Sequence, residues 1–178
     1  LDERAPNARR LPREEALAEL TTRYFSSHGP ATVQDFAWWS GLTVADVKAG
    51  LQMVKGQLVE DVIDGKSCWR AAELPEMREI QSPKAYLLPP YDEYTIAYKD
   101  HGAIFNPDYR EQVRTAVFDR AILIDTQVVG FWRRTFSKGA AVIELVPLRP
   151  LSAAEDAAIA DAARLYGEFI GMPIVLAD

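Results

Sequence analysis

The amino-acid sequence predicts an α+β fold: a winged helix-turn-helix over about residues 13–72, then a β-rich domain over residues 84–178 that a carboxy-terminal helix closes. Three features predict it. Two short amphipathic stretches meet at Gly41, two strand-like runs flank Asp64-Gly65, and three further strand-like runs precede an alanine-rich segment. Residues 1–12 are charged and proline-punctuated, which is typical of an arm or linker.

The capping residues predict the helix-turn-helix. Thr32 precedes the first amphipathic stretch, with Asp35 in its first turn. Thr43 precedes the second, and Asp46 follows three residues later, as in an approximate capping box. Gly41 stands where the first of these helices must end in a left-handed conformation.

A further helix is expected over about residues 13–27, because its hydrophobic residues recur at helical spacing until Gly29-Pro30. The helix after Gly41 is expected to reach about Lys55. It contains Gly50, which costs roughly 1 kcal/mol against alanine inside a helix and so indicates close packing. With a hairpin that turns through Asp64-Gly65, this order is that of a winged helix, a fold most often used on nucleic acid.

The β-rich domain follows a predicted linker over residues 74–83. Tyr91 to Tyr98 fits either a short helix or an irregular segment. Ser152 and Glu155 form a capping box that starts the last helix, which is expected to reach about Ile170. The strands are expected over residues 58–63, 67–71, 86–88, 117–124, 128–136, 141–147 and 173–176.

The bulk composition is that of a soluble globular protein, with 48% hydrophobic and 26% charged residues. No apolar run approaches the ~20 residues of a membrane span, so no membrane partner is expected. The single cysteine, Cys68, excludes an internal disulfide and favours a reducing cytoplasm, where it would be a small packed residue. The net charge of −6 argues against a broad DNA-binding face, so any nucleic-acid surface must be local.

No sequence motif indicates a metal or cofactor, and none is expected. His28 and His101 are far apart and are interpreted as ordinary structural residues. Asp92, Tyr94 and His101 also allow the hypothesis of a self-contained enzyme, provided that they converge in a pocket. The favoured interpretation is structural: Asp92 caps a short helix, while Tyr94 and Tyr98 pack on the sheet.

The best basic patch lies on a predicted strand. Alternation directs Arg133 and Thr135 to one face and Trp132 and Arg134 to the other. With Lys138 and Lys99, these arginines are candidates for binding phosphate, although a solvated sheet edge explains them equally well.

The predicted recognition helix offers Gln52 for adenine and Lys48 or Lys55 for phosphate, and Lys66 adds one charge on the wing. Asp46 would repel the DNA backbone, and the helix has no arginine. DNA contact and a scaffold or protein-contact role are both left open for this helix.

Three segments resemble the AlkZ/YcaQ-type DNA glycosylases, and their order and spacing match. The first is Arg23 to Thr32, continuing through Asp35-Phe36-Ala37-Trp38-Trp39-Ser40-Gly41-Leu42. The second is Leu87 to Tyr94, continuing through Tyr98-Lys99-Asp100, and the third is Gly130-Phe131-Trp132-Arg133-Arg134. The resemblance covers most of the chain from about Arg13 onward.

The resemblance implies tandem winged helices, then a small β-barrel-like domain, and metal-free repair of alkylated or crosslinked DNA. The family's catalytic element is a glutamine, a hydrophobic residue, then glutamine or aspartate, and this chain lacks it: Gln34-Asp35 are adjacent, Gln52 precedes Met53-Val54, and Gln57 precedes Leu58-Val59. No catalytic residue is therefore assigned.

The leading hypothesis is the DNA-binding and scaffold portion of a glycosylase-like repair protein, inactive alone. Its expected partners are double-stranded DNA, intact or damaged, and a missing amino-terminal winged-helix half, which the start at Leu1 without an initiator methionine suggests. The alternative is a protein-interaction or transcription-regulatory module, which the net charge and the weak recognition helix favour.

Overall fold

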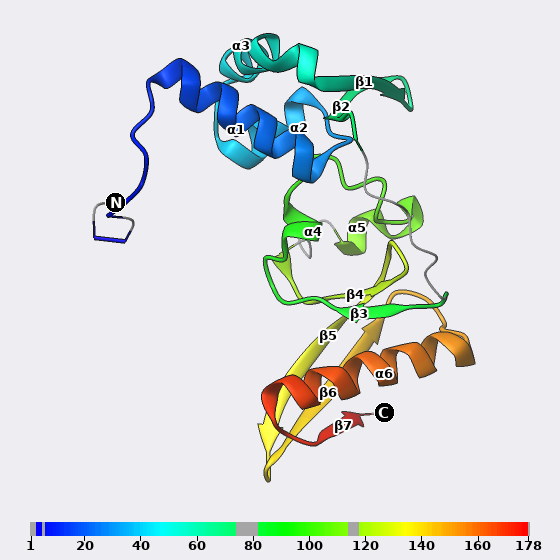
Figure 1. Cartoon of the computed structure of the whole chain (residues 1–178). Coiled ribbons are helices and arrows are strands. Elements are labelled where there is room, and N and C mark those ends of the chain that lie inside the picture. Colours follow the sequence, from blue (N-terminus) through cyan, green and yellow to red (C-terminus); the bar gives the residue numbers. More distant parts are fainter. Residues whose placement is uncertain (1–2, 5, 74–81, 114–117, 178) are drawn as a thin grey trace. The chain divides into compact units, whose positions relative to one another are not determined.

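The computed structural model describes all residues except 1–2, 5, 74–81, 114–117 and 178. It is an α+β chain that divides into two compact units (Figure 1). The helical unit comprises residues 1–76 and 97–99, and the β unit comprises residues 77–96 and 100–178. Most of the predicted linker at 74–83 lies outside the described residues. None of the described helices is long and apolar enough to cross a membrane.

Three helices make up most of the helical unit: α1 (Arg13–His28), α2 (Val33–Ser40) and α3 (Val44–Val54). The structure confirms the cap predicted for α2. The Thr32 hydroxyl accepts the Asp35 backbone N–H, and the Asp35 carboxylate accepts the Thr32 backbone N–H. Gly41 ends α2 with a φ of 69°, a left-handed conformation that glycine adopts without a steric penalty.

The capping box predicted at α3 forms only in part. The Thr43 hydroxyl accepts the Asp46 backbone N–H at 3.1 Å, as expected. The Asp46 carboxylate, however, accepts the Thr43 hydroxyl proton and a guanidinium N–H of Arg13. The Asp46 carboxylate is therefore engaged by a tertiary contact with Arg13 and does not return to the Thr43 backbone N–H, as the carboxylate of Asp35 returns to Thr32 at α2.

A two-stranded hairpin follows α3 and a short 3₁₀ turn (Lys55–Gln57). Strand β1 (Leu58–Ile63) pairs with β2 (Lys66–Ala71) through Asp64 and Gly65, both with positive φ. Trp69 of β2 also exchanges two backbone hydrogen bonds with Ala31, at 2.8 and 3.0 Å. The hairpin is thereby attached to the loop between α1 and α2.

The helical core consists of aromatic and branched side chains: Tyr24, Phe25, Ala31, Phe36, Val47, Leu51 and Trp69. The close packing predicted at Gly50 is confirmed, since a Cβ there would lie 2.3 Å from the Thr21 hydroxyl oxygen and 3.1 Å from Leu17. Cys68 is buried, as expected of a packed residue, and burial raises the pKa of its thiol.

The β unit is built on a five-stranded sheet in the order β3-β4-β5-β6-β7, antiparallel except for the parallel pair β6 and β7. The strands span Ala85–Leu87, Ala121–Ile124, Gln127–Ser137, Ala140–Pro147 and Ile174–Ala177. The strand predicted from residue 117 begins only at Ala121. Of the residues before it, the Phe118 carbonyl accepts the N–H of Tyr91 and the Asp119 carboxylate accepts that of Arg120; residue 117 is outside the described chain.

Helix α6 (Ala153–Ile170) packs against the sheet (Figure 1). Its predicted capping box is present, with Ser152 and Glu155 bonded reciprocally. Ile159 and Ala163 of α6 are buried against Trp132 and Ile143 of the sheet. Two short helices, α4 (Glu93–Ile96) and α5 (Arg110–Val113), and a 3₁₀ turn (Pro107–Tyr109) complete the unit. The segment that the sequence left undecided at Tyr91 to Tyr98 is therefore partly helical.

Candidate nucleic-acid interface

The arginines of β5 lie on opposite faces of the sheet, as the sequence predicts. Trp132 and Arg134 face α6: the two rings of Trp132 and Tyr166 are 5.4 Å apart, and the Arg134 guanidinium lies 5.5 Å from the Tyr166 ring. Arg134 also lies 5.2 Å from the ring of Phe136. Two aromatic rings thus hold this guanidinium by cation–π contacts while its residue stays exposed.

The Arg133 side chain lies on the other face. It lines a cavity of about 200 Å³ whose remaining lining residues are Arg134, Thr135, Val142, Glu144 and Ala177. Glu144 stands directly opposite Arg133 on β6. The Arg133 guanidinium nevertheless forms no hydrogen bond or ion pair with any residue that the structure describes. Its planar set of N–H donors is therefore available to an anion such as a phosphate.

Lys138 lies at the tip of the same hairpin, in the turn between β5 and β6, where it has a φ of 50°. It is exposed, like both arginines. One hairpin therefore carries three of the four cations of the predicted patch. The fourth, Lys99, belongs to the helical unit, where its backbone N–H donates to Asp35 Oδ1 at 2.9 Å. The structure thus divides the predicted patch between the two units.

The helical unit has its own candidates. Lys48 and Gln52 are exposed on α3, and Lys66 is exposed at the start of β2. Sequence reasoning missed Arg13, which donates to Asp46 Oδ1 at 2.6 Å. The two residues are 33 positions apart, so no local pattern signals the contact.

Arg13 and Asp46 each stabilise the charged form of the other. The hydrogen bond from Arg13, followed by that from Thr43, lowers the pKa of Asp46, and the same contact with Asp46 raises the pKa of Arg13. Asp46 was expected to repel a DNA backbone. In the folded unit, its charge is compensated by the adjacent guanidinium.

Apolar side chains are also exposed around α3 and the hairpin. Val44 and Met53 of α3 are 42% and 45% exposed, and Val62 and Ile63 of β1 are 75% and 42% exposed. Exposed aliphatic residues are more typical of a protein interface than of a DNA interface. These exposed side chains therefore support the alternative of a protein partner.

The residues of the enzyme hypothesis, Asp92, Tyr94 and His101, each have a separate local contact. Asp92 Oδ1 accepts the Tyr94 backbone N–H at 2.9 Å, so it caps α4 as the structural interpretation predicts. The Tyr94 hydroxyl donates to the carbonyl of Thr126, and burial raises the pKa of Tyr94. His101 packs edge-on against Phe105. Each of the three groups has a local structural contact of its own.

Tyr98 corrects one structural expectation. It does not pack on the sheet with Tyr94: it belongs to the helical unit, where its hydroxyl donates to the carbonyl of His28 at 2.7 Å. Its neighbour Ala97 is 1% exposed. The chain returns to the helical unit for three residues here, which no periodicity in the sequence could reveal.

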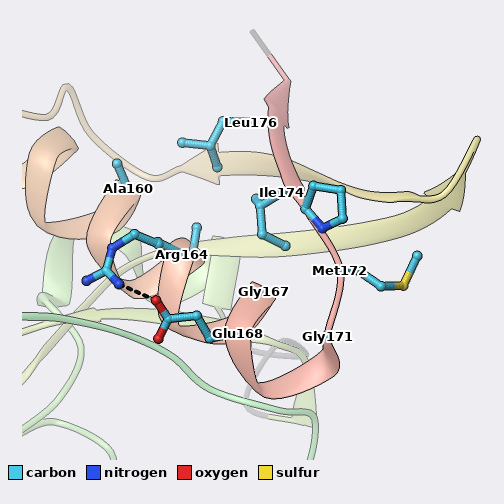
Figure 2. Close-up of a pocket in the computed structure, with 10 residues that line it drawn as sticks. Ala160, Arg164, Gly167, Glu168, Gly171, Met172, Ile174 and Leu176 are labelled. Carbon is cyan, nitrogen blue, oxygen red and sulfur yellow. Dashed lines mark hydrogen bonds and ion pairs between the residues drawn. The ribbon is translucent and has the colours of Figure 1, made fainter.

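A larger cavity of about 450 Å³ lies between α6 and β7 (Figure 2). Ala160, Ala163, Gly167, Met172 and Ile174 give it a mostly apolar lining. Its charged residues, Arg164 and Glu168, are paired with each other at 2.5 Å (Figure 2). The two formal charges of the lining therefore cancel. Among the described residues, no group of three His, Cys, Asp or Glu side chains could hold a metal ion.

Comparison with known proteins places these features in context. The family model described as "DNA glycosylase AlkZ-like" matches residues 1–169. The solved structure of Streptomyces sahachiroi DNA glycosylase AlkZ superposes with a TM-score of 0.70 at 19% sequence identity. The match covers 96% of this chain and 48% of that one, so the chain spans about half the length of its relative. No protein with a curated functional description matched.

Proposed function

Because the chain belongs to the AlkZ-like DNA glycosylase family, we propose that it is the DNA-binding and scaffold portion of a glycosylase-like repair protein. The family match over residues 1–169 is the observation that carries this proposal. The proposed substrate is duplex DNA that carries an alkylated or crosslinked base.

The helical unit is proposed to be a winged helix. Support comes from the order of α1, α2, α3 and the hairpin, and from the backbone bonds that join Trp69 to Ala31. In this arrangement α3 is the recognition helix and the turn at Asp64-Gly65 is the tip of the wing. Lys48, Gln52 and Lys66 would then approach the duplex.

The β5–β6 hairpin is proposed to be the stronger DNA contact. Its cations are Arg133, Arg134 and Lys138, all exposed, and Arg133 has no partner among the described residues. A guanidinium without a carboxylate partner gains the full benefit of a phosphate contact, because no existing ion pair must first be broken.

Base release is assigned to residues outside this chain. Cleavage of the base–sugar bond requires a polar side chain that positions a water or stabilises a cationic sugar. The family's catalytic triplet is missing from the sequence, and Asp92, Tyr94 and His101 are each engaged in separate contacts. The chain alone is therefore expected to bind DNA without cleaving it.

Fluorescence anisotropy with a short duplex, intact or with an abasic site, tests the proposal at two salt concentrations. We expect salt-sensitive binding that tightens at the abasic site, since phosphate contacts release counterions. Absence of binding at low salt would refute a DNA-binding role for this chain.

The alternative function is a protein-interaction or transcription-regulatory module. The exposed aliphatic residues Val44, Met53, Val62 and Ile63 around α3 and β1 favour it, as does the net charge of −6. Salt separates the two functions, because contacts between apolar surfaces depend weakly on ionic strength and phosphate contacts depend on it steeply.

A further inference from the structure

Packing between α1 and α3 brings an arginine to the recognition helix, which has none of its own. Leu17 and Thr21 of α1 lie against Gly50 of α3, so the two helices approach closely. Arg13, one turn before Leu17, consequently reaches Asp46, one turn before Gly50. This tertiary contact thus places an arginine beside α3, whose own sequence contains none.

The hydrogen bonds leave Asp46 satisfied and Arg13 open. Asp46 Oδ1 accepts from Arg13 Nη2 at 2.6 Å, and Oδ2 accepts from the Thr43 hydroxyl at 2.9 Å. The Thr43 hydroxyl in turn accepts the Asp46 backbone N–H, which fixes the carboxylate at the start of α3. The Arg13 side chain remains 73% exposed, and a guanidinium has five N–H donors.

We propose that Arg13 binds a phosphate of the DNA backbone and that Asp46 is the positioning residue that orients its guanidinium. The inference rests on the proposed DNA-binding function and adds a contact to it. An exposed Arg–Asp pair contributes only about 0–1 kcal/mol to stability, so stability alone is a weak reason for this arrangement. A side chain held in one orientation, by contrast, binds a phosphate with a smaller entropic cost.

The sign of the Asp46 effect distinguishes positioning from repulsion. If Asp46 only repels DNA, then Asp46→Asn tightens binding. If Asp46 orients Arg13, the same substitution weakens binding, and the weakening disappears once Arg13 has been replaced. Binding of a short duplex by anisotropy at several salt concentrations, for Arg13→Ala, Asp46→Asn and the double variant, measures this directly.

We expect Arg13→Ala to weaken binding about five- to tenfold at low salt and to reduce the salt slope by about 1, as for one lost phosphate contact. Asp46→Asn should weaken binding about threefold alone and should not weaken it further in the Arg13→Ala background. Arg23→Ala is the matched control: Arg23 also lies on α1, pairs with Glu19, and is 74% exposed, but is not paired with α3. It should change binding less than twofold.

Three outcomes would overturn the inference. Tighter binding by Asp46→Asn would make Asp46 a repulsive residue only. Unchanged binding by Arg13→Ala, in a chain that still binds duplex, would remove Arg13 while leaving the proposed function intact. Failure of the unaltered chain to bind duplex would refute the proposed function and this contact with it. Thermal melting of all variants checks that each is folded.

Discussion

The two units use their polar side chains differently. In the helical unit, the carboxylates in the first turns of α2 and α3 are hydrogen-bonded within the unit: Asp35 accepts from Thr32 and Lys99, and Asp46 accepts from Arg13 and Thr43. In the β unit, the exposed end of β5 leaves Arg133 without a described partner.

This difference separates polar groups that hold the fold from polar groups that are available to a ligand. A buried carboxylate with several donors stabilises its unit, and its loss leaves those donors unsatisfied. An exposed guanidinium without a partner contributes little to stability, so its removal should affect only binding. Substitutions in the two units should therefore produce separable losses, of stability in one and of affinity in the other.

The largest effect is expected for Asp35→Ala. Asp35 is 6% exposed, and its carboxylate accepts the backbone N–H groups of Thr32 and Lys99, both at 2.9 Å. Its removal deletes half of a capping box and leaves the donors of two partly buried hydrogen bonds without their acceptor, which should lower the free energy of unfolding by about 3 kcal/mol. Chemical denaturation followed by tryptophan fluorescence measures the loss.

Asp35→Asn provides the control for that prediction. The amide retains one carbonyl oxygen as an acceptor but has a donor in place of the second, so its cost should be roughly half that of alanine. A loss below about 1 kcal/mol for Asp35→Ala would show that water replaces the lost acceptor, and the contrast between the units would weaken.

The next effect is expected at Gly50, where α1 and α3 approach each other. A Cβ at this position would lie 2.3 Å from Thr21 Oγ1, which itself donates to the carbonyl of Leu17. Gly50→Ala should therefore destabilise by about 2 kcal/mol, despite the better helix propensity of alanine. Gly56→Ala, where a Cβ meets nothing within 4 Å, is the control and should change the melting temperature little.

Removal of both β5 arginines tests the prediction that substitutions in the β unit reduce affinity for DNA. Arg133→Ala with Arg134→Ala should weaken duplex binding roughly 30- to 100-fold at low salt and reduce the salt slope by about 2, since two phosphate contacts are lost. Unchanged affinity at low salt would remove this hairpin from the DNA surface.

Arg133→Ala alone separates binding from stability within the hairpin. It should weaken binding with a change in unfolding free energy below about 0.5 kcal/mol, because Arg133 forms no hydrogen bond or ion pair with a described residue. Arg134 also lies over the rings of Phe136 and Tyr166, so its removal carries an additional small loss of stability. A large loss of stability for Arg133→Ala would contradict its assignment to ligand binding.

Local sequence signals predicted much of the fold. The structure confirms four such predictions: the caps at Thr32 and Ser152, the left-handed Gly41 and the close contact at Gly50. Each depends on the chemistry of a single residue or of residues a few positions apart. The alternation that separates Arg133 from Arg134 is local in the same way.

The contacts that the sequence did not reveal are long-range. Arg13 meets Asp46 across 33 residues, Lys99 meets Asp35 across 64, and Tyr98 meets His28 across 70. Each joins elements whose register is set by packing, and one sequence has no signal for packing between distant elements. The predicted patch of four cations is divided for the same reason, because Lys99 belongs to the three-residue segment that returns to the helical unit.

The last expected effect concerns Glu155, a carboxylate of the β unit that is hydrogen-bonded within its own unit as Asp35 is in the helical unit. Hydrogen bonds from Arg149 and from the Ser152 backbone hold the pKa of Glu155 at about 2, below its usual value of 4.5. The folded state therefore favours the carboxylate, so its contribution is fully present above pH 4.5 and is lost as the pH falls towards 2. Glu155→Gln should lower the free energy of unfolding at pH 7 by about 1 kcal/mol, allowing for solvent screening, and make little difference near pH 2.

Denaturant unfolding across this range measures the effect, with Asp156→Asn as control, since that carboxylate has no partner among the described residues. An equal loss at both pH values would mean that Glu155 acts through its shape and its cap, and that the charge of its pair with Arg149 adds nothing.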